Sequence, residues 1–450
     1  MFDTIAAIST TLGIGAISII RISGPDSINI INKIFKGKQI TEEMDHTINY
    51  GFIVEQDEKI DEVLISYMKA PRTFTKEDII EINCHGGIAT TSKVLELVIK
   101  AGARLAEPGE FTKRAFLNGR IDLVEAEAVM DLIETKSDQA RAVALKNLEG
   151  KTSNYLQQLR EKITDLLVSI EVNIDYPEYT DITTMTTDIV KPKLSDIINE
   201  LQNLINKSND STIIKEGIKT VILGRPNVGK SSLLNALLDE NKAIVTDIAG
   251  TTRDIVEGTI TINGILLNII DTAGIRETQD KIESLGVSKS LELLTSADLV
   301  ILVLNNNEEL TNEDLLLLER IKGKPSIIVI NKIDLQNKLN INQLKEYSLV
   351  MSSMKDKKGI LELKATISDM FQLEKINKND DQFLNSIRQT TLAKEALEIL
   401  NTAYKNLEQD ELDLVELDIK SAWNKLGEIT GETYNEELLD NLFSRFCLGK

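Results

Sequence analysis

The spacing of apolar residues divides the chain into three kinds of segment. From residue 3 to about 116, short apolar runs such as 63–68 and 79–84 predict strands, and residues 90–100 predict a helix. From Phe116 onward, apolar residues recur at helical spacing before Pro177 and again after position 390. These stripes are ordinary packing faces, so we expect a compact α+β domain and two helical blocks.

Between the helical blocks, residues 217–371 alternate strand and helix patterns, which predicts a doubly wound, mostly parallel sheet. The simplest architecture is one helical domain with an α/β domain inserted in it. We therefore predict an α+β domain at 1–116, the first helical part at 117–214, the inserted domain at 215–372 and the second helical part at 373–450, ending in a Cys-x-Gly-Lys tail.

Composition and charge narrow the class of protein. The net charge of −20 argues against broad, unaided attraction to nucleic acid, although a local basic patch or a basic partner stays open. No apolar run is long enough to span a membrane, and the first residues lack a signal-type pattern. We expect a cytoplasmic protein without a membrane partner.

The motif Gly-Arg-Pro-Asn-Val-Gly-Lys-Ser at 224–231 directly follows the apolar run 221–223. A strand that turns through spaced glycines into a helix surrounds a phosphate with backbone N–H groups. Lys230 would reach the β- and γ-phosphates, and the Ser231 hydroxyl would bind Mg²⁺. This stretch is a P-loop. Together with the strand–helix alternation of residues 217–371, it predicts a Ras-like P-loop domain.

Three further motifs follow in the order expected of a GTPase. Residues 246–254 read as a switch loop, 271–274 as an Asp-x-x-Gly motif and 331–334 as Asn-Lys-x-Asp. The Asp334 carboxylate can accept both N1–H and the 2-amino group of guanine, which predicts GTP rather than ATP. The predicted GTP-binding residues are Asn227, Val228, Gly229, Lys230, Ser231, Ser232, Thr246, Asp247, Ile248, Ala249, Gly250, Thr251, Thr252, Asp271, Thr272, Ala273, Gly274, Asn331, Lys332, Asp334, Ser352, Ser353 and Met354.

Ile275 stands where Ras-like GTPases carry the glutamine that orients the attacking water. Glu277 and Glu283 follow as candidates for that task, although a solvated helix face is the ordinary explanation for either one alone. The sequence assigns no arginine finger. A monovalent cation could occupy its place, and Asn227 offers a side-chain oxygen beside the phosphates.

Two features outside the GTPase motifs are unusual. Arg21 and Glu81 lie within strand-like apolar runs, either as surface charges at strand ends or as groups that face a ligand. At the end of the chain, Phe443 and Phe446 would anchor the tail against protein, so we expect an ordered tail.

With these residues in view, the chain from about residue 5 to 450 resembles the MnmE/TrmE family of tRNA-modification GTPases. The most specific marks are residues 21–24, 108–122, 246–254 and 446–450. The resemblance implies an N-terminal domain that dimerises and binds a one-carbon donor, 5-formyl- or 5,10-methylene-tetrahydrofolate, through Arg21, Glu81, Arg120 and Lys450. Position 120 is commonly lysine in the family, so this contact is the least secure.

The resemblance also implies a K⁺-dependent GTPase that is activated by dimerisation of its G domains. Asn227 and backbone groups of Thr246, Ile248 and Thr251 would hold K⁺, and Ser231 and Thr252 would hold Mg²⁺. Residues implied to act in catalysis are Glu283, which would align the water, and Lys230, Arg253, Asp254, Arg276 and Cys447. With an FAD-dependent partner, MnmG (GidA), the family adds an aminomethyl or carboxymethylaminomethyl group to C5 of the wobble uridine of certain tRNAs.

Two other hypotheses stay open at this point. A ribosome-assembly GTPase of the Era or Der type would carry a basic RNA-binding unit after the G domain, whereas the block after Phe371 is helical and acidic. A GTP-regulated scaffold would dimerise without modifying anything. Folate binding by residues 1–120 would count against both.

Overall fold

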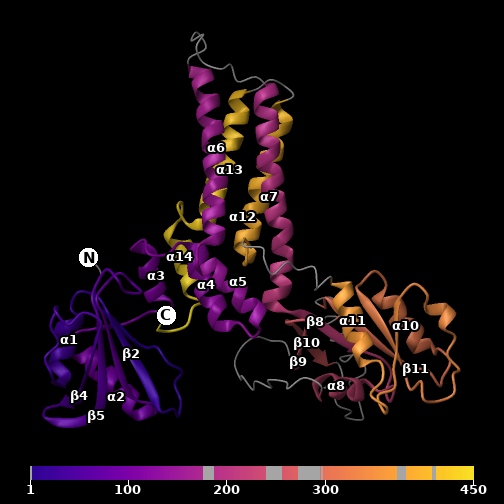
Figure 1. Cartoon of the computed structure of the whole chain (residues 1–450), viewed down its shortest axis with the longest axis horizontal. Coiled ribbons are helices and arrows are strands. Elements are labelled where there is room, and N and C mark those ends of the chain that lie inside the picture. Colours follow the sequence, from indigo (N-terminus) through magenta and orange to yellow (C-terminus); the bar gives the residue numbers. More distant parts are fainter. Residues whose placement is uncertain are drawn as a thin grey trace. The chain divides into compact units, whose positions relative to one another are not determined.

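The computed structural model describes residues 3–175, 187–239, 256–271, 294, 297–371, 382–407 and 412–449. The chain forms two compact units (Figure 1). The first contains Met1–Met130, Asn147–Leu201 and Ile387–Lys450, and the second contains Asp131–Lys146 and Gln202–Ser386.

The first unit begins with a sheet in which seven described strands pair in the order β3-β4-β5-β6-β2-β1-β7. All neighbours are antiparallel except β1 and β7, which are parallel. The strands are β1 (Ile5–Ile8), β2 (Ile17–Ser23), β3 (Phe35–Gly37), β4 (Thr47–Glu55), β5 (Glu58–Met68), β6 (Ile79–His85) and β7 (Arg104–Leu105).

Helices α1 (Ser27–Ile34) and α2 (Ile88–Lys100) share a buried core with the inward residues of this sheet. Exposed and buried residues alternate along β4 and β5, as expected for a sheet with one covered face. On the other face, Ile17, Ile48, Tyr50 and Leu64 are 45–69% exposed. The sheet thus presents apolar side chains to solvent.

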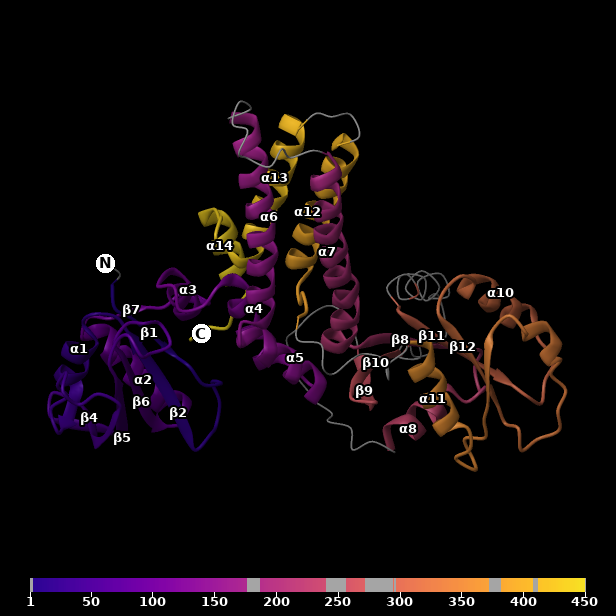
Figure 2. The same cartoon turned by 45° about the horizontal axis from the view of Figure 1, so that its top comes forward.

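The helical part combines segments from both sides of the second unit. Helices α6 (Lys151–Asp175), α12 (Ile387–Asn406), α13 (Leu412–Thr430) and the first part of α7 (Thr187–Glu216) lie side by side in both views (Figures 1 and 2). The predicted stripes are buried: Leu156, Ile163 and Ile170 on α6, and Val415, Ile419 and Leu426 on α13, are each 0% exposed. The prediction of one helical domain from two distant blocks is confirmed.

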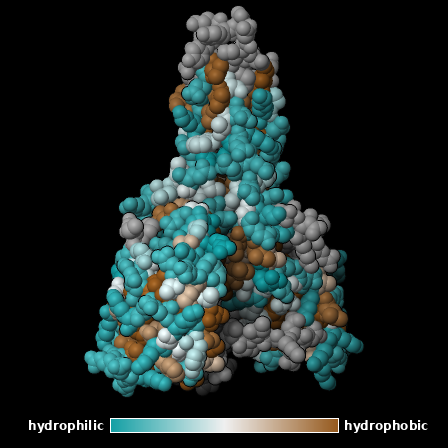
Figure 3. Space-filling view, turned by 60° about the vertical axis from the view of Figure 1, so that its left-hand side comes forward, coloured by the Kyte–Doolittle hydropathy of each residue, from teal (hydrophilic) through white to brown (hydrophobic). Residues whose placement is uncertain are grey.

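Shorter helices complete the first unit: α3 (Glu110–Leu117), α4 (Leu123–Glu134, which continues into the second unit) and α14 (Glu436–Phe443). The bundle surface is mostly hydrophilic with scattered apolar groups (Figure 3). Val168 on α6 and Leu414 and Leu417 on α13 are exposed apolar residues. No helix in the described part of the chain is both long and apolar enough to cross a membrane.

In the second unit, the described strands form one sheet in the order β13-β12-β11-β8-β10-β9. Only the β9–β10 pair is antiparallel. The strands are β8 (Ile218–Leu223), β9 (Val256–Ile262), β10 (Ile265–Asp271), β11 (Leu299–Asn305), β12 (Ser326–Asn331) and β13 (Ser348–Met351). The helices include α8 (Lys230–Asp239), α10 (Asn312–Ile321) and α11 (Ile360–Met370), and η1 (Ile341–Leu344) is a 3₁₀ helix. The predicted doubly wound, mostly parallel sheet is confirmed.

Helix α5 (Asp138–Leu148) packs on this sheet, although it lies within the predicted helical segment 117–214. Ala140 belongs to the buried core of the sheet, and Gln139 Nε2 donates a hydrogen bond to the Asn263 carbonyl at 2.6 Å. Periodicity identifies the helix but carries no information about which core it joins.

The end of the chain is folded against the first unit. Phe443 and Phe446 are 2% and 7% exposed and share a core with Phe116. The Gly449 carbonyl accepts hydrogen bonds from Ser9 Oγ at 3.2 Å and from Arg21 Nη1 at 3.3 Å. The prediction of an ordered tail is confirmed as far as residue 449.

Candidate nucleotide-binding site

The P-loop runs from the end of β8 to the start of α8 and passes very close to two neighbouring strands. A Cβ atom at Gly224 would lie 2.5 Å from the Val303 carbonyl oxygen, and one at Gly229 would overlap the Asn331 side chain. Both glycines also have positive φ angles, 144° and 110°. The loop therefore needs glycine at both positions for steric and conformational reasons.

The lysine of the loop folds back over it. Lys230 Nζ donates to the carbonyls of Gly224 at 2.8 Å and Arg225 at 2.9 Å. Asn227 adopts a left-handed conformation with φ of 60°, which asparagine tolerates better than most residues. The ammonium group and the Asn227 side chain are thus brought to the loop that is expected to surround a phosphate.

Asn331 links the P-loop to the loop after β13. Its Nδ2 donates to the Val228 carbonyl at 2.9 Å, and its Oδ1 accepts from the Met354 amide at 3.2 Å. Ser353 Oγ donates to Asp334 Oδ1 at 3.0 Å, which orients that carboxylate. The structure therefore brings the P-loop together with two motifs that follow it by more than 100 residues.

These motifs line a cavity of about 600 Å³, within the usual range for small-molecule sites. Its lining residues are Asn227, Gly229, Lys230, Ser231, Ser232, Asn331, Lys332, Asp334, Leu335, Met354 and Lys355. Of the predicted residues whose side chains the structure describes, three do not line it: Val228, Ser352 and Ser353 are buried, and their contacts hold the loops.

Arg225 and its partners form an ionic cluster beside the P-loop that is not apparent from the sequence. Arg225 pairs with Asp314 at 2.9 Å and with Glu308 at 2.7 Å, and these pairs raise the pKa of its guanidinium. Asp314 is 2% exposed and also forms a capping box with Thr311 at the start of α10. The Thr-x-x-Asp pattern at 311–314 predicts a helix cap. It does not indicate that Asp314 pairs with Arg225 of the P-loop.

The switch residues and several proposed ligands lie outside the described residues. They are Thr246, Asp247, Ile248, Ala249, Gly250, Thr251, Thr252, Arg253, Asp254, Thr272, Ala273, Gly274, Arg276, Glu283 and Lys450. Asp271 ends β10, but its side chain is likewise outside the description. Their predicted roles stay predictions.

A second cluster lies on the N-terminal sheet. Arg21 and Glu81 face each other across β2 and β6, with Arg21 Nε 2.9 Å from Glu81 Oε1. Their side chains are 16% and 22% exposed, and Arg21 also reaches the tail at Gly449. The two unusual charges therefore pair with each other, and Arg21 also connects this pair to the tail.

Arg120 and the cysteines are placed differently. The Arg120 guanidinium lies 4.9 Å from the Phe74 ring centre, and no contact among the described residues joins it to Arg21 or Glu81. Cys447 is an exposed free thiol in the tail. Cys84 is buried, which raises the pKa of its thiol. Cys447 is thus the accessible thiol of the two.

Comparison with known proteins covers the whole chain. The model of the TrmE N-terminus matches residues 4–120, and the model of the MnmE helical domain matches residues 123–447. The chain belongs to the MnmE family. A tRNA modification GTPase MnmE of Ligilactobacillus salivarius is 50% identical over 100% of this chain and 98% of that protein, and one of Bacillus cytotoxicus is 50% identical over 100% of both.

Among solved structures, the G domain of the FeoB iron transporter of T. maritima is 32% identical over 34% of this chain and 98% of that chain. Its TM-score of 0.27 adds nothing to the assignment. The family assignment rests on the full-length relatives. The match over the full length of the chain favours the MnmE hypothesis over an Era- or Der-type protein.

Proposed function

We propose that this chain hydrolyses GTP as part of tRNA wobble-uridine modification. The observation that carries the proposal is the 600 Å³ cavity that is lined both by Lys230 at the end of the P-loop and by Asp334 in the loop after β12. The printed name of the full-length relatives, tRNA modification GTPase, supports the same activity. GTP is the nucleotide that satisfies Asp334, since adenine offers no pair of donors to this carboxylate.

The lining of the cavity fits the two cations that the family resemblance implies. Ser231 begins α8 beside Lys230 and would hold Mg²⁺ together with Thr252, while Asn227 would hold K⁺ with backbone groups of Thr246, Ile248 and Thr251. Both side chains that lie within the described residues line the cavity. When bound, the cations would neutralise charge on the transferring phosphoryl group.

The catalytic water needs a residue other than the one at position 275, because isoleucine cannot orient it. We propose Glu283 for this task, with Arg253, Asp254 and Arg276 as further residues on which turnover depends. Lys230 is held over the P-loop by two carbonyls and would exchange these for phosphate oxygens.

The N-terminal unit is proposed to bind the tetrahydrofolate one-carbon donor near Arg21, Glu81 and Lys450. Support comes from the Arg21–Glu81 pair beside Gly449, and from a cavity of about 530 Å³ that Ser9 lines while it also bonds to Gly449. Arg120 has no contact to this cluster among the described residues, so it is the weakest member of the set. Cys447 lies in the same tail as an exposed thiol.

Two protein partners complete the proposal. A second copy of the chain would pair through the exposed sheet face that carries Ile17, Ile48, Tyr50 and Leu64. The FAD-dependent MnmG (GidA) would share the work on tRNA, which suits a chain with a net charge of −20 that needs help to hold RNA.

The test is GTP turnover of the full chain in K⁺ and in Na⁺ at equal ionic strength. We expect GTP turnover to be faster in K⁺ than in Na⁺. The Glu283→Ala variant should lose this K⁺-stimulated GTP turnover. The other candidate glutamate supplies the control, since Glu277→Ala should keep most of the activity. Equal rates in both salts, with Glu283→Ala unaffected, would refute the cation and the water-aligning role together.

A further inference from the structure

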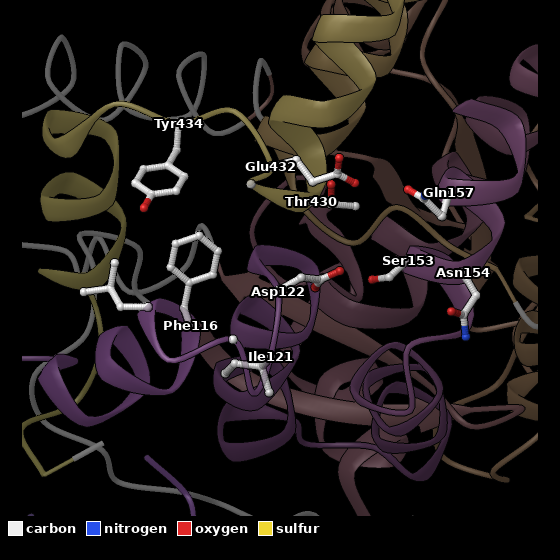
Figure 4. Close-up of a pocket in the computed structure, with 12 residues that line it drawn as sticks. Phe116, Ile121, Asp122, Ser153, Asn154, Gln157, Thr430, Glu432 and Tyr434 are labelled. Carbon is white, nitrogen blue, oxygen red and sulfur yellow. The ribbon is translucent and has the colours of Figure 1, made fainter. Parts of the chain in front are cut away.

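Both carboxylates and one amide that line a cavity of about 460 Å³ in the first unit already have partners (Figure 4). Asp122 accepts a backbone hydrogen bond at the start of α4 at 2.8 Å, and Glu432 pairs with the buried Arg160. The Gln157 amide donates to Glu161 within α6 at 3.5 Å. These contacts stabilise α4, α6 and the loop after α13.

An ionic cluster of a different kind lies directly against the P-loop. Arg225 follows Gly224, and its guanidinium pairs with Asp314 at 2.9 Å and with Glu308 at 2.7 Å. The side chains of Arg225, Asp314 and Glu308 are 18%, 2% and 48% exposed. Arg225 is not among the described residues that line the nucleotide cavity. Its charge is therefore held at the segment after β11.

Other contacts fix both carboxylates of this cluster in turn. Asp314 Oδ2 accepts hydrogen bonds from the Thr311 amide at 3.0 Å and from its hydroxyl at 2.8 Å. Glu308 Oε1 accepts from Asn305 Nδ2 at 2.6 Å, at the end of β11. The hydrogen bond from Arg225 is the main cause that lowers the pKa of Glu308. The arginine thus has two charged acceptors whose positions are already set.

A second contact anchors the P-loop only three residues later. The Val228 carbonyl accepts from Asn331 Nδ2 at 2.9 Å, and Val228 is 2% exposed. Pro226 and Asn227 lie between the two anchors, and the proline ring restricts its own φ angle. Arg225 and Val228 therefore hold both ends of a two-residue segment.

Asn227 needs these anchors because neither its backbone nor its exposure fixes it. Its φ of 60° is sparsely populated, and such a conformation persists only where the surrounding structure determines it. Its side chain is exposed and lines the nucleotide cavity near Lys230. A cation ligand must keep its distance within about 0.2 Å. The direction of the Asn227 oxygen therefore depends on the residues that hold the segment.

We propose that Arg225, Asp314 and Glu308 are positioning residues that hold Asn227 in the orientation required to bind a monovalent cation. The inference rests on the proposed function, which assigns Asn227 to K⁺, and it adds the side chains that orient this ligand. Because Lys230 and Asp334 stay in place without the cluster, its loss should weaken cation binding more than nucleotide binding.

The test measures cation binding directly, with thallium(I) in place of K⁺. The full chain is loaded with Mg²⁺, GDP and aluminium fluoride in nitrate salts, and thallium binding is followed by thallium NMR. Arg225→Gln should raise the half-saturating thallium concentration about tenfold, the effect of lost charged hydrogen bonds. Glu308→Ala, at a half-exposed ion pair, should raise it about threefold.

Three further measurements separate positioning from a general structural role. Arg225→Lys keeps the charge but not the forked geometry, so its effect should lie between that of Arg225→Gln and none. The affinity for GDP alone should change by less than about twofold in each variant, since the phosphate-binding lysine is retained. Glu309→Ala is the matched control, because Glu309 is the next exposed glutamate and makes no contact with Arg225 among the described residues.

Unchanged thallium binding in Arg225→Gln and Glu308→Ala would overturn the proposal, as would an equal effect of Glu309→Ala. An equal loss of GDP affinity would also overturn it, because the cluster would then stabilise the whole P-loop. If Arg225→Gln does not fold, Glu308→Ala decides alone, since this side chain is 48% exposed and its loss does not threaten folding. An unmodified chain that binds no thallium would refute the K⁺ site of the proposed function as well, whereas normal binding in every variant would refute this inference alone.

Discussion

Buried ion pairs stabilise the N-terminal part of the first unit. Arg114 is the clearest case, since it is 2% exposed and pairs with Asp3, Glu77 and Glu110. Arg104 shares Asp3 and Glu110 with it, and the hydrogen bond from Arg104 is the main cause that lowers the pKa of Asp3 to about 2. This network joins Asp3, which precedes β1, and Arg104 on β7 to α3.

Replacing Arg114 with methionine should lower the free energy of unfolding by about 3 kcal/mol. The carboxylates of Glu77 and Glu110 are largely buried, and both would lose their ion pair with Arg114. Urea unfolding monitored by circular dichroism measures the change. Lys113 is the matched control, since its pair with Asp440 is solvent-exposed and Lys113→Met should cost less than about 1 kcal/mol. Equal losses in the two variants would contradict the structural role of Arg114.

For single residues, the sequence predicted which side chains belong to the nucleotide site better than it predicted which side chains contact each other. Lys230, Asp334 and the glycines of the P-loop were found because their chemistry is tied to local spacing. The pairing of Arg225 with Asp314, or of Arg21 with Glu81, joins residues that are 89 and 60 positions apart. Only the sheet register and the packing of α10 bring them together, and neither can be read from periodicity.

The C-terminal tail packs closely against β1 and β2 of the N-terminal sheet at Gly449. Gly449 has a φ of 88°, and a Cβ atom there would overlap the Ile8 carbonyl oxygen. Its own carbonyl accepts from both Ser9 and Arg21. The tail therefore depends on a glycine at a point where it touches the proposed folate cluster.

Gly449→Ala should displace the end of the tail and weaken binding of 5-formyl-tetrahydrofolate by about tenfold, the equivalent of one or two hydrogen bonds. Isothermal titration calorimetry with the folate measures this, and GDP affinity of the same variant should stay unchanged. Gly323→Ala in the second unit is the control, since a Cβ atom at Gly323, which also has a positive φ, meets nothing within 4 Å. If Gly449→Ala binds the folate like the unmodified chain, the tail does not form part of that site.

Helical periodicity predicted the helices and their buried faces, but it did not predict which core each helix packs against. The stripes on α6, α12 and α13 predicted these helices and their buried faces. Helix α7 continues to Glu216, and its later residues pack in the core of the second unit, as Ile214 does. The docking of α5 on the same sheet likewise depends on tertiary contacts that are absent from the local pattern.

For the whole molecule, the exposed apolar face of the N-terminal sheet is the basis for expecting a dimer. Ile48→Glu should place a charge in the interface and shift the chain toward monomer, as measured by analytical ultracentrifugation. Leu315→Glu is the control, because Leu315 is 49% exposed on α10 of the second unit. A dimer that survives Ile48→Glu, or a Leu315→Glu variant that dissociates equally, would exclude this face as the interface.

The central claim for the whole molecule is that its second unit recognises guanine nucleotides through Asp334. The decisive measurement is the affinity of the full chain and of Asp334→Asn for GDP and for xanthosine diphosphate. Asparagine can accept N1–H and donate to the 2-oxo group of xanthine, so GDP binding should fall by at least about 100-fold while xanthosine diphosphate binding rises. Asp356→Asn, which removes the other carboxylate that Ser353 contacts, should keep the preference for GDP. Unchanged GDP affinity in Asp334→Asn would contradict the account.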